Sequence, residues 1–398
     1  MPAAEKERGT LRGLVLRLLV LVLSSFLTLG LFEAGLRLFH PVPLHFTETF
    51  LADGWQTGRE GAMGHVPNAV GHVKRAEFDV AVRINAHGLR DREIPYEKPP
   101  DVYRILVLGD SQTFGFGVEA EQTYAKLLEQ RLKPLPGSPY RRTETLNAGV
   151  IGTGTAHQLY FLQEQGWKYR PDAVVVGFFF NDVVENTQCR LFTLRGEHLE
   201  QAARAAGKTV LIHEGYRRAR SHEDVQTFTA PAPVRAARPS FWARHFHLVR
   251  FVRERVSNLV QASRRPDTPN TPRPSTELGA RLYEEMARQC RAHDAALLVA
   301  LIPSPHQCRD AALTSLSTHY ASLLRFLKPS PDGKPPVAIL DLLPQIRAAG
   351  ASSLYFPIDG HLNRAGHRRV AGALAPELLR LDSRLGRTDA PPPTPSGR

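Results

Sequence analysis

The chain is poor in cysteine, methionine and tryptophan, with three of each in 398 residues. Three cysteines are too few for a disulfide-stapled scaffold, and the odd number leaves at least one thiol unpaired within a monomer. Acidic residues are also scarce, 39 against 51 basic ones, which gives a formal net charge of +12. The fold must therefore depend on an ordinary apolar core, and the charge suits an anionic partner such as nucleic acid, a phospholipid surface or an acidic envelope polymer.

The N-terminus carries a long apolar run, from Leu18 to Phe32, which extends back to Gly13 if Arg17 reaches the lipid headgroups. The shorter run suits the core of a signal peptide and the longer one a bilayer span. No small-x-small cleavage site follows, so an uncleaved anchor is favoured over a cleaved signal peptide or a buried soluble helix. Basic residues upstream predict an inner-membrane protein whose chain beyond Phe39 faces the periplasm or cell exterior.

Composition predicts a short series of segments after the anchor. An alternating stretch, EFDVAVRINAHG, predicts an edge strand or hairpin ahead of the main domain. An arginine-rich, proline-punctuated insertion is expected to be partly mobile, with a short helix at 246–263. The expected divisions are a stub and anchor at 1–39, an extension at 40–102, the main domain at 103–382 with its insertion at about 187–276, and a disordered tail at 383–398.

From Tyr103 onward, apolar strands alternate with helices, which predicts an α/β fold with a parallel sheet covered on both faces. The expected strands are RILVLGD, TETLNAG, DAVVVGFFF, ALLVALIP and PVAILDLL. The expected helices lie at 122–132, 156–165, 277–293, 315–327 and 365–381. Because ligands bind outside the carboxyl ends of such strands, the residues that follow each strand are the candidates for chemistry.

Those strand ends supply the groups needed for acyl transfer. Ser111 follows the first strand, at a strand-to-helix turn whose free N–H groups favour a developing anion. Gly152 lies in a glycine-bearing loop after the second strand, and Asn181 follows the third. Asp359 and His361 lie two residues apart near the end of the chain. A neutral imidazole can take the serine proton, and a neighbouring carboxylate can orient it and stabilise the imidazolium.

Together these segments resemble the SGNH (GDSL) hydrolase family, over residues 103–186 and 354–379. The resemblance implies a three-layer, flavodoxin-like sandwich with a five-stranded parallel sheet in the order 2-1-3-4-5. It also implies that Ser111 is the nucleophile, His361 the general base and Asp359 its orienting acid. The implied oxyanion hole consists of the N–H groups of Ser111 and Gly152 and the side chain of Asn181.

The motifs INAHGLRD, FEAGLRLF and NDVVEN resemble the membrane-anchored bacterial members of that family. The chain departs from the commonest family pattern in two places. Asp359 and His361 are two apart rather than three, as in the alginate-acetylation branch, and Phe180 precedes Asn181 where many members carry glycine. The second departure bears on the shape of the loop more than on the role of Asn181.

Each of these residues alone has an ordinary structural explanation: Gly109-Asp110-Ser111 as a turn, Gly152 as a bend, Asn181 as a helix cap. Their joint order at successive strand ends favours catalysis. The sequence GFGVEA formally matches a dinucleotide fingerprint but begins too far after the strand, and the histidines lack metal-ligand spacing, so we expect no cofactor and no metal. No nucleic-acid motif accompanies the basic charge.

The strand order implied by the family places Cys189 and Cys308 on one rim of the sheet, which makes them a candidate disulfide, with free thiols as the alternative and Cys290 outside the pair. The favoured function is an extracytoplasmic serine esterase or lipase-like hydrolase acting on an acyl ester of a lipid or glycan. One alternative keeps the same residues and transfers the acyl group to an envelope polysaccharide. A second alternative is a non-catalytic protein that binds envelope glycan or lipid.

Overall fold

The structure is a computed structural model, and the segments it describes form two compact units. The described residues are 2–39, 51–53, 63–75, 77–189, 191–201, 209–213, 216–220, 246, 248–249, 251–252, 276–312 and 337–385. The two units are Met1–His45 with Ala237–Thr271, and Phe46–Ala236 with Pro272–Arg398. The expected helix at 315–327, most of that at 246–263, and the end of the tail lie outside the described residues.

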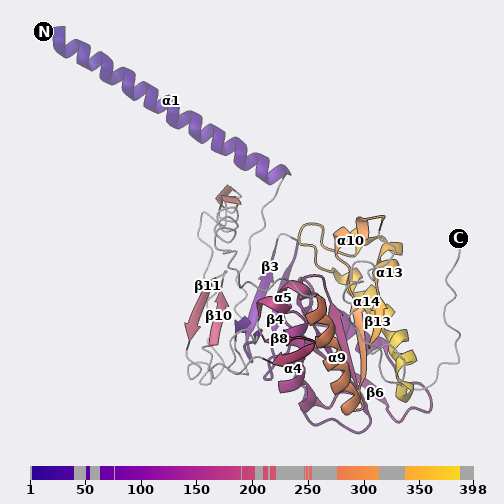
Figure 1. Ribbon diagram of the computed structural model, residues 1–398. Helices are drawn as coiled ribbons and strands as arrows, with labels where there is room; N and C mark the ends of the chain where they lie inside the picture. Colours follow the sequence, from indigo (N-terminus) through magenta and orange to yellow (C-terminus); the bar gives the residue numbers. More distant parts are fainter. Residues whose placement is uncertain are drawn as a thin grey trace. The chain divides into compact units, whose positions relative to one another are not determined.

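The first unit contains the long helix α1 (Pro2–Phe39; Figure 1). The most apolar 18-residue window of its segment Val15–Phe39 has a mean hydropathy of 2.3 and is not buried against protein. Near the end of the helix, the backbone N–H of Leu248 donates to the Glu33 carboxylate at 2.7 Å. By length and composition the apolar segment suits either a membrane span or a signal sequence.

The core of the second unit is a five-stranded parallel sheet. Its strands are β5 (Val102–Gly109), β6 (Arg142–Gly149), β7 (Ala173–Phe178), β12 (Ala296–Leu301) and β13 (Ala338–Asp341). Their spatial order is β13-β12-β7-β5-β6, and every neighbouring pair is parallel. Numbered along the chain this is 2-1-3-4-5, so the expected fold is confirmed. Every residue of β5 and β7 is buried, as an almost wholly apolar central strand requires.

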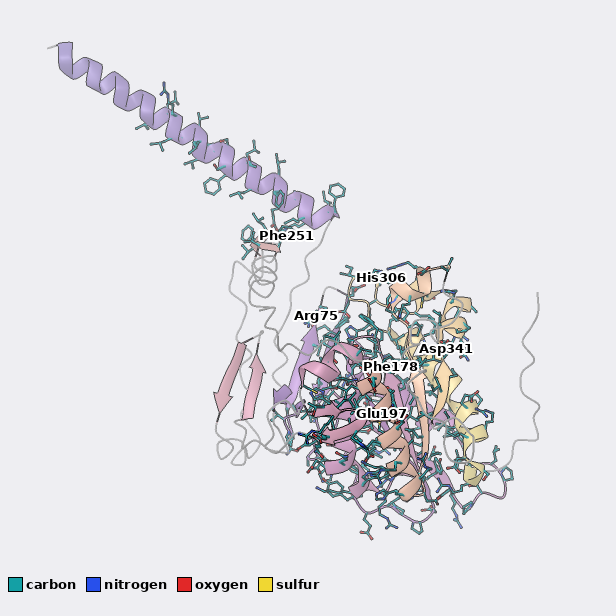
Figure 2. All side chains as sticks on the ribbon, viewed as in Figure 1. Arg75, Phe178, Glu197, Phe251, His306 and Asp341 are labelled. Carbon is teal, nitrogen blue, oxygen red and sulfur yellow. The ribbon has the colours of Figure 1, made fainter. Side chains whose placement is uncertain are left out.

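Helices cover both faces of this sheet, as Figures 1 and 2 show. On one face α3 (Tyr124–Arg131) packs with α14 (Arg364–Leu381); on the other α4 (Thr155–Glu164) packs with α9 (Thr276–Ala292). Both ends of each of these four helices lie within two residues of the expected ends. The shorter helices are α2 (Ser111–Phe114), α5 (Asp182–Gln188), α10 (Pro305–Arg309), α13 (Leu343–Ala348), and the 3-10 helices η1 (Ala120–Gln122), η2 (Gly166–Tyr169), η3 (Ala351–Ser353) and η4 (Ser383–Leu385).

The alternating stretch of the extension forms an antiparallel hairpin of β3 (Val70–Lys74) and β4 (Asp79–Arg83). Val80 and Val82 are buried while Asp79, Ala81 and Arg83 are exposed, as the alternation predicted. The buried face of the hairpin packs against Phe114 and Phe116, the residues that end and follow α2. The hairpin therefore belongs to the same core as the helix that carries Ser111.

The insertion contains strands that its sequence did not predict. A hairpin forms from β8 (Phe192–Arg195) and β9 (His198–Gln201), while β1 (Leu51–Asp53), β2 (Met63–His65), β10 (Thr209–His213) and β11 (Tyr216–Arg220) make a four-stranded antiparallel sheet. The strand β11 has the sequence YRRAR, in which arginines replace the apolar alternation on which strand prediction depends. β8 pairs with β9 and β10 with β11 as local hairpins, and the pairing of β1 with β10 joins the second hairpin to the extension.

Candidate active site

Ser111, His361 and Asp359 meet at the carboxyl end of the sheet. The Nε2 atom of His361 lies 2.8 Å from the Oγ atom of Ser111. The other ring nitrogen, Nδ1, lies 2.5 Å from Oδ1 of Asp359. A proton on Nδ1 leaves Nε2 as an acceptor for the serine proton, which is the tautomer that general-base catalysis needs. The structure thus brings together three groups that the sequence separates by up to 250 residues.

The turn that presents Ser111 depends on close backbone approaches. Asp110 is the N-cap of α2, and its carboxylate accepts the N–H of Gln112 at 2.9 Å. A Cβ atom on Gly109 would lie 1.9 Å from the Thr113 hydroxyl, and one on Gly149 would lie 2.3 Å from the backbone nitrogen of Phe114. Both positions need glycine because α2 lies directly against β5 and β6. Ser111 therefore starts a helix whose position is fixed by backbone packing.

The hairpin of the extension positions Asp359. The Glu77 carboxylate accepts the backbone N–H groups of Ile358 at 3.1 Å and of Asp359 at 2.7 Å. Burial acts to raise the pKa of the Asp359 carboxyl, but the hydrogen bond with His361 and the charges of His361 and Arg75 outweigh it, so the pKa lies below its usual value. Arg75 follows β3 (Figure 2). Asp359 is consequently ionised at neutral pH, as an acid that orients a histidine must be.

Aromatic rings from the same hairpin and from α2 form a wall beside the histidine. The ring centre of Phe116 lies 4.7 Å from that of His361, and Phe78 meets Phe116 edge-on at 5.7 Å. Phe356, in the catalytic loop, packs against Phe78 at 4.7 Å. The imidazole is thus held on one side by packed rings, while 23% of its side chain stays exposed to solvent.

Arg90, from the INAHGLRD motif, holds the segment that follows Ser111. Its guanidinium donates to the carbonyl oxygens of Phe114 at 2.9 Å, Gly115 at 2.7 Å and Val118 at 2.7 Å. The side chain is almost fully buried, and burial lowers the pKa of Arg90 to about 10. The same segment contains the formal dinucleotide match, which these contacts explain as a turn around a guanidinium. Sequence reasoning singled out the motif but assigned Arg90 no role.

The NDVVEN motif forms α5 and ties it to the loop that contains Gly152. The Asp182 carboxylate accepts the Thr155 hydroxyl at 3.2 Å, and the Asn186 side-chain oxygen accepts the backbone N–H of Ala156 at 2.8 Å. Gly152 itself is exposed, in the left-handed region at a φ of 70°. These contacts fix the start of α4, next to the loop that the sequence predicted as part of an oxyanion hole.

The side-chain amide of Asn181 is hydrogen-bonded to a carboxylate. Its Nδ2 atom donates to Oε1 of Glu185 at 2.9 Å. An amide group has two N–H donors, so one further N–H is left to reach Asp110 or an oxyanion. Ser111 is the first residue of α2, so its N–H has no acceptor within the helix. The role of Ser111, Gly152 and Asn181 as an oxyanion hole stays a prediction.

Three acids gather behind this site, and sequence reasoning did not find them. Asp110 and Asp182 are fully buried, and Glu185 is partly buried beside them. Burial raises the pKa of Asp110 to about 6 and that of Glu185 to about 7; burial, together with the charges of Asp110 and Glu185, raises the pKa of Asp182 well above its usual value. The cluster therefore retains protons near neutral pH, which avoids the cost of adjacent buried charges.

The candidate Cys189–Cys308 disulfide is not formed; both residues are thiols in the structure, which was the alternative. The Cys189 sulfur donates to the backbone oxygen of Asn186, and Cys308 is buried in α10. His367, in α14, is buried and accepts the backbone N–H of Tyr124 at 3.1 Å. Burial lowers the pKa of His367 to about 3, so it packs as a neutral ring.

No cluster of three or more histidine, cysteine, aspartate or glutamate side chains with the geometry of a metal site occurs among the described residues. The groups that meet at this site are a serine hydroxyl, an imidazole and a carboxylate, together with the N–H donors around them. Such a set suits the transfer of an acyl group through a covalent intermediate on the hydroxyl.

Comparison with protein-family models and with curated proteins gives no match. Among solved structures, the chain is similar to LAE5, an alpha/beta hydrolase from the metagenome of Lake Arreo, Spain, at 15% identity and a TM-score of 0.39, over 72% of this chain and 99% of that one. It is also similar to a lipase/acylhydrolase from Enterococcus faecalis, at 12% and 0.36, over 70% and 97%. A putative lipolytic protein of the G-D-S-L family from Desulfitobacterium hafniense DCB-2 aligns at 10% and 0.35, over 69% and 98%. At such identities and TM-scores these likenesses carry no weight for activity or substrate.

We predict that Arg90→Gln destabilises the protein by about 2 to 4 kcal/mol, because it takes a charged donor from three carbonyl oxygens and a glutamine cannot reach all of them. Urea unfolding measures this change. The matched control is Arg92→Gln, two residues along, whose side chain is 46% exposed and forms surface ion pairs worth at most about 1 kcal/mol. Equal losses in the two variants would show that Arg90 is not a clamp.

The acid cluster predicts a pH dependence of stability. Folding raises the pKa of Asp182. The stability that its protonated carboxyl contributes is therefore fully present below the unfolded-state pKa and is lost as the pH rises through the folded-state pKa. We expect Asp182→Asn to lose less unfolding free energy than wild type between pH 5 and pH 8, measured by urea titration at each pH. The control is Asp294→Asn, an exposed acid. A wild-type pH slope in Asp182→Asn contradicts the prediction.

Proposed function

We propose that this chain is a serine esterase that cleaves an acyl ester through a covalent acyl-enzyme. The observation that carries the proposal is the unbroken pair of contacts from Asp359 through His361 to Ser111, at 2.5 and 2.8 Å. Two such contacts on one imidazole set its tautomer and aim its free nitrogen at the hydroxyl. Ser111 is 9% exposed as a residue, so its side chain is closely packed by its surroundings.

In the proposed reaction the Ser111 oxygen attacks the ester carbonyl while His361 Nε2 takes the hydroxyl proton. The imidazolium that results is stabilised by the Asp359 carboxylate. Negative charge collects on the former carbonyl oxygen, where the N–H groups of Ser111 and Gly152 and the amide of Asn181 would receive it. When the intermediate collapses, the ester carbon–oxygen bond breaks and the imidazolium proton goes to the departing alcohol. Water then repeats the sequence and releases the acid.

The protein is proposed to be held at a membrane by α1, with the catalytic unit outside the cytoplasm. Support comes from the helix itself, because its polar side chains have partners within it. The hydroxyls of Ser24 and Ser25 donate to the backbone oxygen of Leu21, and that of Thr28 to the backbone oxygen of Ser24. Such internal bonds satisfy polar groups that lipid cannot. The apolar length of 25 residues is sufficient for a span.

The esterase proposal predicts that the full-length chain, in a nonionic detergent, hydrolyses p-nitrophenyl acetate and that Ser111→Ala lowers kcat/KM at least about a thousandfold, because it removes the hydroxyl that takes the acyl group. The matched control is Ser304→Ala, since Ser304 caps α10 outside the site. Activity that survives in Ser111→Ala would contradict the proposal. The membrane anchor is tested separately, in cells that express the full-length chain. The esterase activity should sediment with the membranes after a carbonate wash. Activity in the soluble fraction would contradict the anchor but not the esterase proposal.

A further inference from the structure

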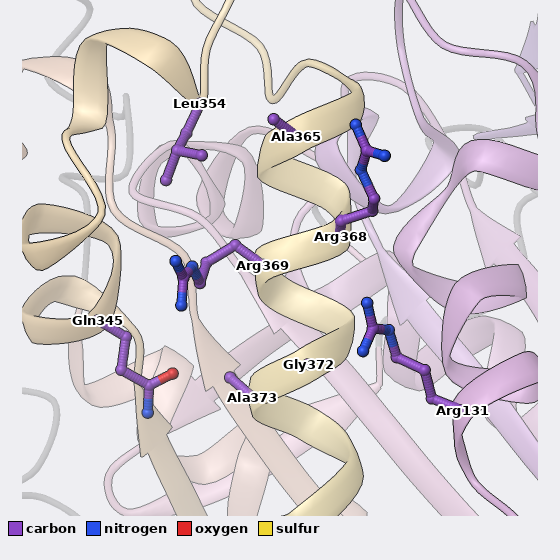
Figure 3. Close-up of a pocket in the computed structure, with 8 residues that line it drawn as sticks. All are labelled: Arg131, Gln345, Leu354, Ala365, Arg368, Arg369, Gly372 and Ala373. Atoms are coloured by element: carbon purple, nitrogen blue, oxygen red, sulfur yellow. The ribbon is translucent and has the colours of Figure 1, made fainter.

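A basic groove of about 500 Å³ crosses α14 away from the catalytic residues. Arg368 and Arg369 project from α14, Arg131 reaches it from the last turn of α3, and Gln345 from α13 (Figure 3). Arg131 and Arg368 lie on one side of the helix, and Arg369 lies with Gln345 on the other. Between these two pairs of side chains the surface of α14 is hollowed, because Gly372 carries no side chain.

The three arginines have no anionic partner within the segments that the structure describes. None of them forms an ion pair there, and no acid lines the groove. Arg380 shows the contrast, since it lies on the same helix and pairs with Glu377 at 2.8 Å. Gathering like charges around one hollow costs free energy unless an anion neutralises them. The arrangement is therefore the one expected of a surface that binds an anion.

The shape and chemistry of the groove indicate what kind of anion fits. Arginine forks match the paired oxygens of carboxylate or phosphate groups, and three forks at separate points suit a ligand with repeated anionic groups. Leu354 is the one large apolar side chain in the lining, which leaves little to hold an acyl chain. A Cβ atom added to Gly372 would meet nothing within 4 Å, so the floor of the groove is open.

We propose that this groove binds an anionic glycan chain through its carboxylate or phosphate groups. The groove lies along α14, which begins at Arg364, three residues after His361. Arg368 lies one turn further, about 6 Å along the helix axis. The link between a glycan bound there and the ester that the triad cleaves rests on the proposed function. The binding itself does not.

The test measures binding of a fluorescent ten-residue oligogalacturonate to the full-length chain in a nonionic detergent, by fluorescence polarisation. We expect Arg368→Gln to weaken binding roughly tenfold, the loss typical of one charge-assisted bidentate contact. Arg380→Gln removes the same charge from the same helix outside the groove and should change binding less than twofold. Gly372→Trp fills the floor and should weaken binding as Arg368→Gln does, whereas Gly372→Ala should not.

Two comparisons decide the nature of the ligand. A neutral maltodecaose should not compete, and glycerophosphoglycerol, a free phospholipid headgroup, should compete at least about a hundredfold more weakly than unlabelled oligogalacturonate. Equal losses in Arg368→Gln and Arg380→Gln would reduce the binding to overall charge and overturn the proposal. Competition by the headgroup at the level of the glycan would overturn it in favour of a lipid. The Ser111→Ala chain should bind like wild type, so failure here leaves the esterase proposal intact.

Discussion

The hydrogen bond between Ser111 and His361 is the contact on which the chemistry of this protein depends. It joins the first strand of the sheet to the loop before the last helix, across 250 residues. Such a bond has the right length only if both backbones are held, and each is held by separate means. Glycines at 109 and 149 let α2 lie against the strands, and the isolated bridge between Tyr355 and Leu362 closes the catalytic loop.

The extension before the sheet is part of this arrangement. Glu77 fixes the backbone of Asp359, Phe78 supports the ring wall beside His361, and Arg90 holds the chain that follows the nucleophile. All three come from residues that precede β5, so the catalytic geometry is shared between the extension and the sheet domain. These residues contact backbone groups and rings. They hold the groups of the site in place and do not take part in the reaction themselves.

The sheet and the meeting of the proposed catalytic residues could be predicted because each has a local signal. An apolar strand such as RILVLGD shows its burial directly, and Ser111, Asn181 and His361 stand where such strands end or just before a helix. Glu77 and Arg90 had no such signal, since their roles arise from contacts with residues up to 282 positions away.

Two features of the structure could not be determined from the sequence. The disulfide between Cys189 and Cys308 was inferred from a shared rim, but a bond requires Cα atoms within about 7 Å, which strand order alone does not fix. The acids at 182 and 185 were noted only as part of the motif NDVVEN. Their raised pKa values follow from burial that only the packed structure reveals.

The most direct test of the central claim is reaction of the full-length chain with a fluorophosphonate, followed by peptide mass spectrometry. The reagent phosphonylates a serine only where a base has activated its hydroxyl, so it reports on the contact between Ser111 and His361 without need of the natural substrate. The account predicts a single adduct on Ser111, and its loss in His361→Gln. Wild-type chain that stays unlabelled at Ser111, or a label that persists at the same rate in His361→Gln, would contradict it.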